Sequence, residues 1–125
     1  MAKSCIFCTL YRENLDILCE TGFFFSTPDK HPVVPNHSLI IPKRHVISLF
    51  ELNKTEWNDL QKAIANTVKV IENAERKPDG YNLGLNEGRA AGRTIDHLHI
   101  HLIPRYSGDV SFPAGGVRNV IKNTK

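Results

Sequence analysis

Three histidines spaced two residues apart, His97, His99 and His101, are the side chains of this chain best suited to chemistry. If their segment is a strand, alternate side chains share one face, and the three imidazoles lie on it roughly 7 Å apart. Such a row serves a metal site, because imidazole is a common zinc ligand. It equally serves nucleophilic catalysis, because a neutral imidazole attacks phosphorus well and then leaves well. The plain alternative is a polar strand that faces solvent.

Cys5 and Cys8 form a C-x-x-C pair, which is compatible with a zinc site, a redox site or chance. A redox site is typical of a thioredoxin-like βαβ unit, which the expected fold does not supply. A zinc site needs two ligands besides the two thiolates. The third cysteine, Cys19, falls in an expected strand and is interpreted as a small core residue.

The elements that must position these residues are mostly strands. Short apolar segments predict five of them, at residues 17–20, 23–26, 39–41, 81–86 and 96–104. In the last segment Leu98, Ile100 and Leu102 alternate with the histidines and are expected to face the core. Most connections are short, which favours an antiparallel sheet and the class α+β.

One strong helix is predicted to run from Thr55, as its N-cap, to Ile71. Apolar side chains recur along it at spacings of three and four residues, as on an amphipathic helix. These are Trp57, Leu60, Ile64, Val68 and Ile71. A short helical turn is expected near residues 49–52, and the tail after Pro104 is expected to be irregular.

Length and composition exclude several classes of function. A chain of 125 residues predicts one domain, residues 1–125. It has no apolar run near the roughly 20 residues of a membrane helix and no apolar segment typical of a secretory signal. Its 3 cysteines, an odd number, argue against a disulfide framework and favour a reducing, cytoplasmic setting. The net charge of +3 is too small to predict nucleic-acid binding, although it suits a small anionic substrate.

Three stretches of the chain together resemble the histidine triad (HIT) family of nucleotide hydrolases and transferases. They are the H-φ-H-φ-H-φ-φ segment at residues 97–103, the pair Asn86-Glu87-Gly88 and Ala91-Gly92-Arg93-Thr94, and the segment PNHSLIIPKRH at residues 35–45. The resemblance extends from about Cys5 to about Arg118. It implies a five-stranded antiparallel sheet with one long helix and a short helix, and a homodimer in which two sheets align.

The resemblance also implies a mechanism. His99 is expected to attack the α-phosphate of an adenine-type nucleotide, giving a nucleotidyl-histidine that water hydrolyses. His101 and His37 match the other histidines of the catalytic site. The residues expected at the substrate are Asp29 on the ribose, and Asn86 and Thr94 on the phosphates. The plain alternative for Asp29 and Asn86 is loop and turn chemistry.

For the cysteine pair, the resemblance points to the zinc-containing, bacterial-type branch of the family. It implies a structural Zn²⁺ held by Cys5, Cys8, His45 and His97. Otherwise the cysteines are buried thiols and His45 is a surface histidine.

The chain departs from the family pattern at several positions. Arg93 stands where the family usually has glutamine, and it either holds a longer polyphosphate or points to solvent. Residues 11–15 replace the family's usual segment, and Arg118 is expected near the substrate.

Three functions follow from these observations. The first is hydrolysis of dinucleoside polyphosphates or adenosine phosphoramidates. The second is a nucleotidylyltransferase or phosphorylase, whose first half-reaction is the same. The third is a nucleotide-binding module with little activity.

Overall fold

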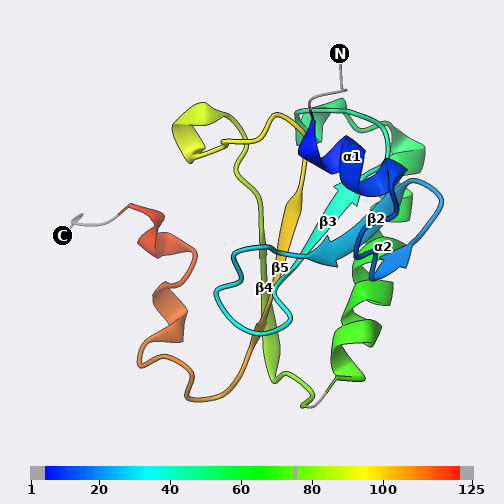
Figure 1. The fold of residues 1–125 in the computed structure, drawn as a ribbon. Helices are drawn as coiled ribbons and strands as arrows, with labels where there is room; N and C mark the ends of the chain where they lie inside the picture. Colours follow the sequence, from blue (N-terminus) through cyan, green and yellow to red (C-terminus); the bar gives the residue numbers. More distant parts are fainter. Residues whose placement is uncertain (1–4, 75, 122–125) are drawn as a thin grey trace.

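A computed structural model describes residues 5–74 and 76–121. Its centre is a five-stranded sheet in the order β1-β2-β3-β5-β4, with every neighbouring pair antiparallel (Figure 1). The strands are β1 (Cys19–Glu20), β2 (Phe24–Pro28), β3 (Ser38–Pro42), β4 (Gly80–Gly84) and β5 (Ile100–Arg105). The predicted α+β class and the five-stranded antiparallel sheet are confirmed.

The long helix α2 (Lys54–Glu72) has its N-cap two residues before the predicted one. Asn53, not Thr55, caps it, because Asn53 and Glu56 form a reciprocal capping box. The Asn53 side chain accepts from the Glu56 N–H at 2.8 Å, and the Glu56 carboxylate accepts from the Asn53 N–H at 2.9 Å. Trp57, assigned to the apolar stripe, is 46% exposed.

The two faces of the sheet carry separate apolar clusters. Between the sheet and α2 lies the larger one, which includes Phe24, Leu60 and Ile100. On the other face a smaller cluster includes Phe7 and Phe25. Phe24 and Phe25 are consecutive in β2 and fall in different clusters, as the alternation of a strand requires.

Phe7 belongs to a helix that sequence reasoning missed, α1 (Ile6–Arg12). At 7 residues it is too short for helical periodicity to be visible, and an isolated helix of this length is unstable without tertiary contacts. The helical turn expected near residues 49–52 is present as η2 (Leu49–Glu51). The tail expected to be irregular contains two short 3₁₀ turns, η4 (Pro113–Gly115) and η5 (Arg118–Val120).

The prediction of a strand over residues 96–104 is wrong at its start. The chain bends at residues 95–97 and β5 begins only at Ile100. The expected alternation nevertheless continues through the segment, because Leu98, Ile100 and Leu102 are all buried. The described residues contain no helix long and apolar enough to cross a membrane.

Candidate functional site

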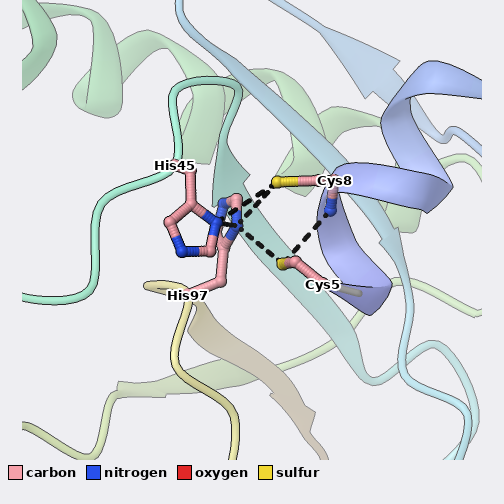
Figure 2. A group of neighbouring side chains, drawn as sticks. All are labelled: Cys5, Cys8, His45 and His97. Carbon is pink, nitrogen blue, oxygen red and sulfur yellow. Dashed lines mark hydrogen bonds between the residues drawn. The ribbon is translucent and has the colours of Figure 1, made fainter. Parts of the chain in front are cut away.

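The four predicted metal ligands lie together at one end of the sheet (Figure 2). Cys5 caps α1, Cys8 lies in its first turn, His45 follows β3, and His97 lies in the bend before β5. Their ligand atoms all fall within 4.8 Å of one another. We call this group the Cys–His cluster.

The distances within the Cys–His cluster fit one tetrahedral zinc. Cys5 Sγ lies 3.2 Å from His97 Nδ1, and Cys8 Sγ lies 3.3 Å from His45 Nδ1. The two Nδ1 atoms are 3.1 Å apart. Zinc bonds of about 2.3 Å to sulfur and 2.0–2.1 Å to nitrogen place neighbouring ligand atoms about 3.5 Å apart. Two thiolates and two imidazoles are also a common structural zinc set.

The protonation states of His97 and Cys8 are also compatible with metal binding. His97 Nε2 donates to the carbonyl of Pro42 at 2.9 Å, so the lone pair of the neutral ring is on Nδ1, toward the cysteines. Burial lowers the pKa of His97 to about 4, which keeps this ring neutral. Burial, with Cys5 beside it, raises the pKa of Cys8 to about 11, so a metal binding here releases a thiol proton.

Long-range contacts hold His45 and His97 against each other. The N–H of Leu98 donates to the carbonyl of Val46 at 2.7 Å, which joins the two segments directly. Arg44, next to His45, binds both carboxylate oxygens of Glu56 at 2.8 and 3.0 Å. Glu56 is 2% exposed, and its hydrogen bonds from Arg44 lower its pKa.

A pocket of about 280 Å³ opens beside α1 and the ends of β2 and β5. Its apolar wall consists of Ile6, Phe7, Leu10, Leu39 and Ile95. Its polar lining includes five predicted site residues, namely Asp29, Asn86, Thr94, His99 and His101. An apolar wall with a few convergent polar groups is typical of a small-molecule site.

His99 is oriented for nucleophilic attack. Its Nδ1 lies 2.8 Å from the carbonyl of His97, which can only accept, so Nδ1 carries the proton. The lone pair of the neutral ring is therefore on Nε2. The ring of Phe7 packs at 5.0 Å between centroids and limits its rotation.

A relay of hydrogen bonds sets the proton of His101 in the same way. The Val33 N–H donates to His37 Nδ1 at 3.1 Å, so the neutral His37 carries its proton on Nε2. That nitrogen lies 2.9 Å from His101 Nδ1, and the proton of His101 is then on Nε2. Burial lowers the pKa of both rings, while the carboxylate of Asp29 acts against the shift.

Asp29 completes a second group of ligand-type atoms with His37 and His101, since its Oδ2 lies 3.3 and 3.6 Å from their facing nitrogens. A metal here would need a lone pair on His37 Nε2, but that atom holds the proton. The group is therefore a hydrogen-bonded relay.

Two residues predicted to lie near the substrate, Arg93 and Arg118, do not line the pocket. Arg93 Nε binds Asp96 at 3.2 Å, and Arg118 lies exposed on η5. Sequence reasoning missed the wall on α1, although its apolar residues flank the predicted cysteines directly. Gly92, which also lines the pocket, has a φ of 104°, which L side chains rarely adopt, and its carbonyl accepts from Asn86.

Sequence comparison places the chain in a known family. Residues 13–108 match the HIT domain, and the chain belongs to this family. An uncharacterised HIT-like protein of Methanocaldococcus jannaschii is 35% identical over 93% of this chain and 91% of its own length.

Enzymes are among the relatives. The adenosine 5'-monophosphoramidase of Candida albicans is 36% identical over 82% of this chain and 70% of its own length. The AP-4-A phosphorylase of Mycobacterium tuberculosis is 39% identical over 66% of this chain, and the match spans only 42% of that enzyme.

Solved structures agree with the fold. A HIT family protein of Bacillus anthracis, 33% identical, superposes with a TM-score of 0.76 over 86% of this chain and 77% of its own. A zinc-bound histidine triad family protein of Mycobacterium smegmatis, 28% identical, gives a TM-score of 0.78 over 90% of this chain and 83% of its own.

Proposed function

We propose that this protein is a nucleotidyl hydrolase that attacks the α-phosphate of adenine-type nucleotides through a nucleotidyl-histidine on His99. The observation that carries the proposal is the position of His99 in the pocket, with its Nδ1 proton held by the His97 carbonyl and its Nε2 lone pair free. The names of the phosphoramidase and phosphorylase relatives support an adenine-nucleotide substrate.

In the proposed reaction a bond forms between His99 Nε2 and phosphorus as the bond to the leaving group breaks. The Nε2–H of His101 donates to a phosphate oxygen and stabilises the charge that develops there. Asn86 and Thr94 hold other phosphate oxygens, and Asp29 accepts from the ribose hydroxyls. Water then attacks phosphorus, releases the nucleoside monophosphate and restores neutral His99.

We infer a structural role for a zinc ion on Cys5, Cys8, His45 and His97, which would assign the chain to the zinc-containing, bacterial-type branch. When bound, the ion supplies a fixed cross-link and no chemistry at phosphorus. Two of these residues link the Cys–His cluster to the pocket. The His97 carbonyl accepts a hydrogen bond from His99, and Cys8 belongs to α1, which forms a wall of the pocket.

The experiment that tests the mechanism is a rapid quench with radiolabelled substrates. The substrates are a panel of adenosine and guanosine phosphoramidates and dinucleoside polyphosphates. We expect the label from the substrates that react to appear on a peptide containing His99. A label on another residue would overturn the mechanism. A protein that binds these nucleotides but never acquires a label would be a binding module instead.

A phosphorylase is the second candidate, favoured by the 39% identity to AP-4-A phosphorylase. Inorganic phosphate would then replace water in the second step. The two are distinguished by product analysis of an adenosine phosphoramidate with and without phosphate, because from that substrate only the phosphorylase forms a nucleoside diphosphate.

We further propose that the protein works as a homodimer in the cytoplasm. Reduced thiols at Cys5, Cys8 and Cys19 suit that compartment.

A further inference from the structure

One buried hydroxyl in the wall of the pocket has no hydrogen-bond partner among the described residues. It belongs to Thr27, in β2. We propose that this hydroxyl accepts a hydrogen bond from the base of the bound nucleotide, and so selects a base with an amino group on the edge that enters the pocket, such as adenine. This inference rests on the proposed function and adds to it a residue that determines base specificity.

Thr27 differs from the other buried hydroxyl residues of the described chain. It is 2% exposed, yet no hydrogen bond joins its hydroxyl to another described residue. The hydroxyls of Ser26 and Thr67 bond to each other at 2.9 Å, and the Ser38 hydroxyl donates to the carbonyl of Asn36 at 2.9 Å. Because buried polar groups nearly always have a partner, the missing partner of Thr27 is expected to come from a ligand.

The Thr27 hydroxyl faces the pocket. Among the described residues, the only enclosed side-chain atom without a partner is the hydroxyl of Tyr81, so that of Thr27 is not sealed in the core. Side chains alternate along β2. Ser26 meets Thr67 of α2 on one face of the sheet, and Thr27 lies on the other face, where it lines the pocket.

The sheet places Thr27 beside the apolar part of the pocket and away from the expected position of phosphorus. Thr27 pairs with Leu39, and Leu39 pairs with His101. Two strand spacings therefore separate Thr27 from His101, which is about 10 Å. Phe7 and Leu10 of α1 pack with Leu39 in one apolar cluster, and all three line the pocket. The hydroxyl thus lies next to an apolar wall that suits the faces of a base.

Asp29 connects this wall to the phosphate site. Its N–H donates to the carbonyl of His37 at 2.9 Å, which continues the pairing of β2 with β3 by one residue. Asp29 therefore points to the same side of the sheet as Thr27, about 7 Å farther along the strand. A nucleotide with its phosphate at His99 and its ribose on Asp29 then extends its base along the wall that contains Thr27.

Filling the pocket makes the hydroxyl selective. A base that packs against Thr27 excludes water from its hydroxyl. An amino group on the inserted edge restores a hydrogen bond, because a hydroxyl oxygen accepts from N–H. A base without such a group leaves the hydroxyl buried and unpaired, which costs more free energy than a typical hydrogen bond contributes. A site built to bond a polar group therefore rejects the analogue that lacks it.

The test measures dissociation constants by calorimetry, with the full chain as purified with its metal. The two ligands are AMP and purine riboside 5'-monophosphate, which differ only in the 6-amino group of the base. We expect the wild-type protein to bind AMP about tenfold more tightly than the analogue.

Three variants locate the effect. Thr27→Val has nearly the same shape and no hydroxyl, so it should weaken AMP binding about tenfold and leave the analogue within about twofold. Thr27→Ser keeps a hydroxyl and should keep the preference for AMP. Thr55→Val is the matched control, because Thr55 is exposed in the first turn of α2 and does not line the pocket. The control should change neither affinity.

Three outcomes overturn the inference. They are equal wild-type affinities for the two ligands, a Thr27→Val variant that keeps the preference, and a Thr27→Val variant that loses affinity equally for both, which would give Thr27 a role in the shape of the pocket alone. If Thr27→Val does not fold, loss of the preference in Thr27→Ser overturns it instead. Failure of the proposed function looks different, since AMP would still bind with its base preference while His99 never carried a label.

Discussion

The chemistry of the pocket depends on which nitrogen of each imidazole carries the proton. The His97 carbonyl fixes the proton of His99, and the Val33 N–H fixes the proton of His101 through His37. Two backbone groups thus determine the tautomers of the two rings. His99 keeps a free lone pair on Nε2, and His101 keeps an Nε2–H that can donate a hydrogen bond. Neither selection requires a charged residue.

Replacing the nucleophile tests this arrangement. His99→Ala should reduce turnover by a factor on the order of 10³ or more, because the covalent route is lost. Its melting temperature should stay near that of the wild type, since His99 lies at the pocket and not in the core. His97→Ala is the comparison, and it should lower both rate and melting temperature. Retention of a large share of turnover by His99→Ala would rule out the nucleophile.

The buried relay predicts a dependence of stability on pH. Burial holds the pKa of His37 below the ordinary histidine value of about 6.5, so the unfolded chain takes up a proton that the folded chain does not. Unfolding is therefore favoured as pH falls. Between pH 7.5 and 5.5 the free energy of unfolding should therefore decrease. His37→Gln should show a correspondingly weaker pH dependence in urea unfolding, and an unchanged dependence would contradict the burial of a neutral ring.

At the scale of elements, the short helix α1 links metal binding to nucleotide binding. It carries Cys8 on one side and the pocket residues Ile6, Phe7 and Leu10 on the other. Phe7 and Leu10 are its buried residues, and Tyr11 packs against the same apolar cluster. A helix of this length relies on such contacts, so the Cys–His cluster should help to hold the pocket wall in place.

Cys8→Ser tests that link. The variant should lose most of its zinc in elemental analysis, melt at a lower temperature and bind AMP several-fold more weakly by calorimetry. Cys19→Ser is the matched control, because Cys19 contacts Ser26 and Thr67 and lies outside the cluster. Wild-type protein with well under half a zinc per chain would argue against the site itself. Unchanged AMP affinity in zinc-free Cys8→Ser would argue against the link.

At the scale of the whole molecule, the exposed edges of the sheet point to assembly. β4 is an edge strand in the described sheet, and the tail beyond it exposes 86% of Phe112. Figure 1 shows this tail, in orange and red, on the opposite side of the view from α2. An edge strand with unpaired backbone groups is a template for pairing with another copy.

We therefore expect a homodimer in solution. Light scattering at micromolar concentration should give twice the chain mass of 14.1 kDa. A mass equal to one chain at that concentration would contradict the prediction.

The local patterns of the chain were sufficient for much of the fold. The spacing of Leu60 and Ile71 predicted α2, and the alternation of Leu98, Ile100 and Leu102 predicted which side of their segment is buried. Both follow from the fixed geometry of one helix or one extended segment, which adjacent residues determine by themselves. The three histidines and the C-x-x-C pair were recognisable for the same reason.

Other features arose only when distant segments met. Cys5 and His97 are 92 residues apart in the chain, and α1 is stable only against the sheet. The proton of His101 depends on a backbone N–H from another loop, and Arg93 turns to Asp96 rather than to the pocket. The sequence by itself determined which side chains are available and which face they occupy. The tertiary structure decided their partners, because hydrogen bonds and metal ligation require particular atoms within about 3 Å, and only the folded path of the chain brings them there.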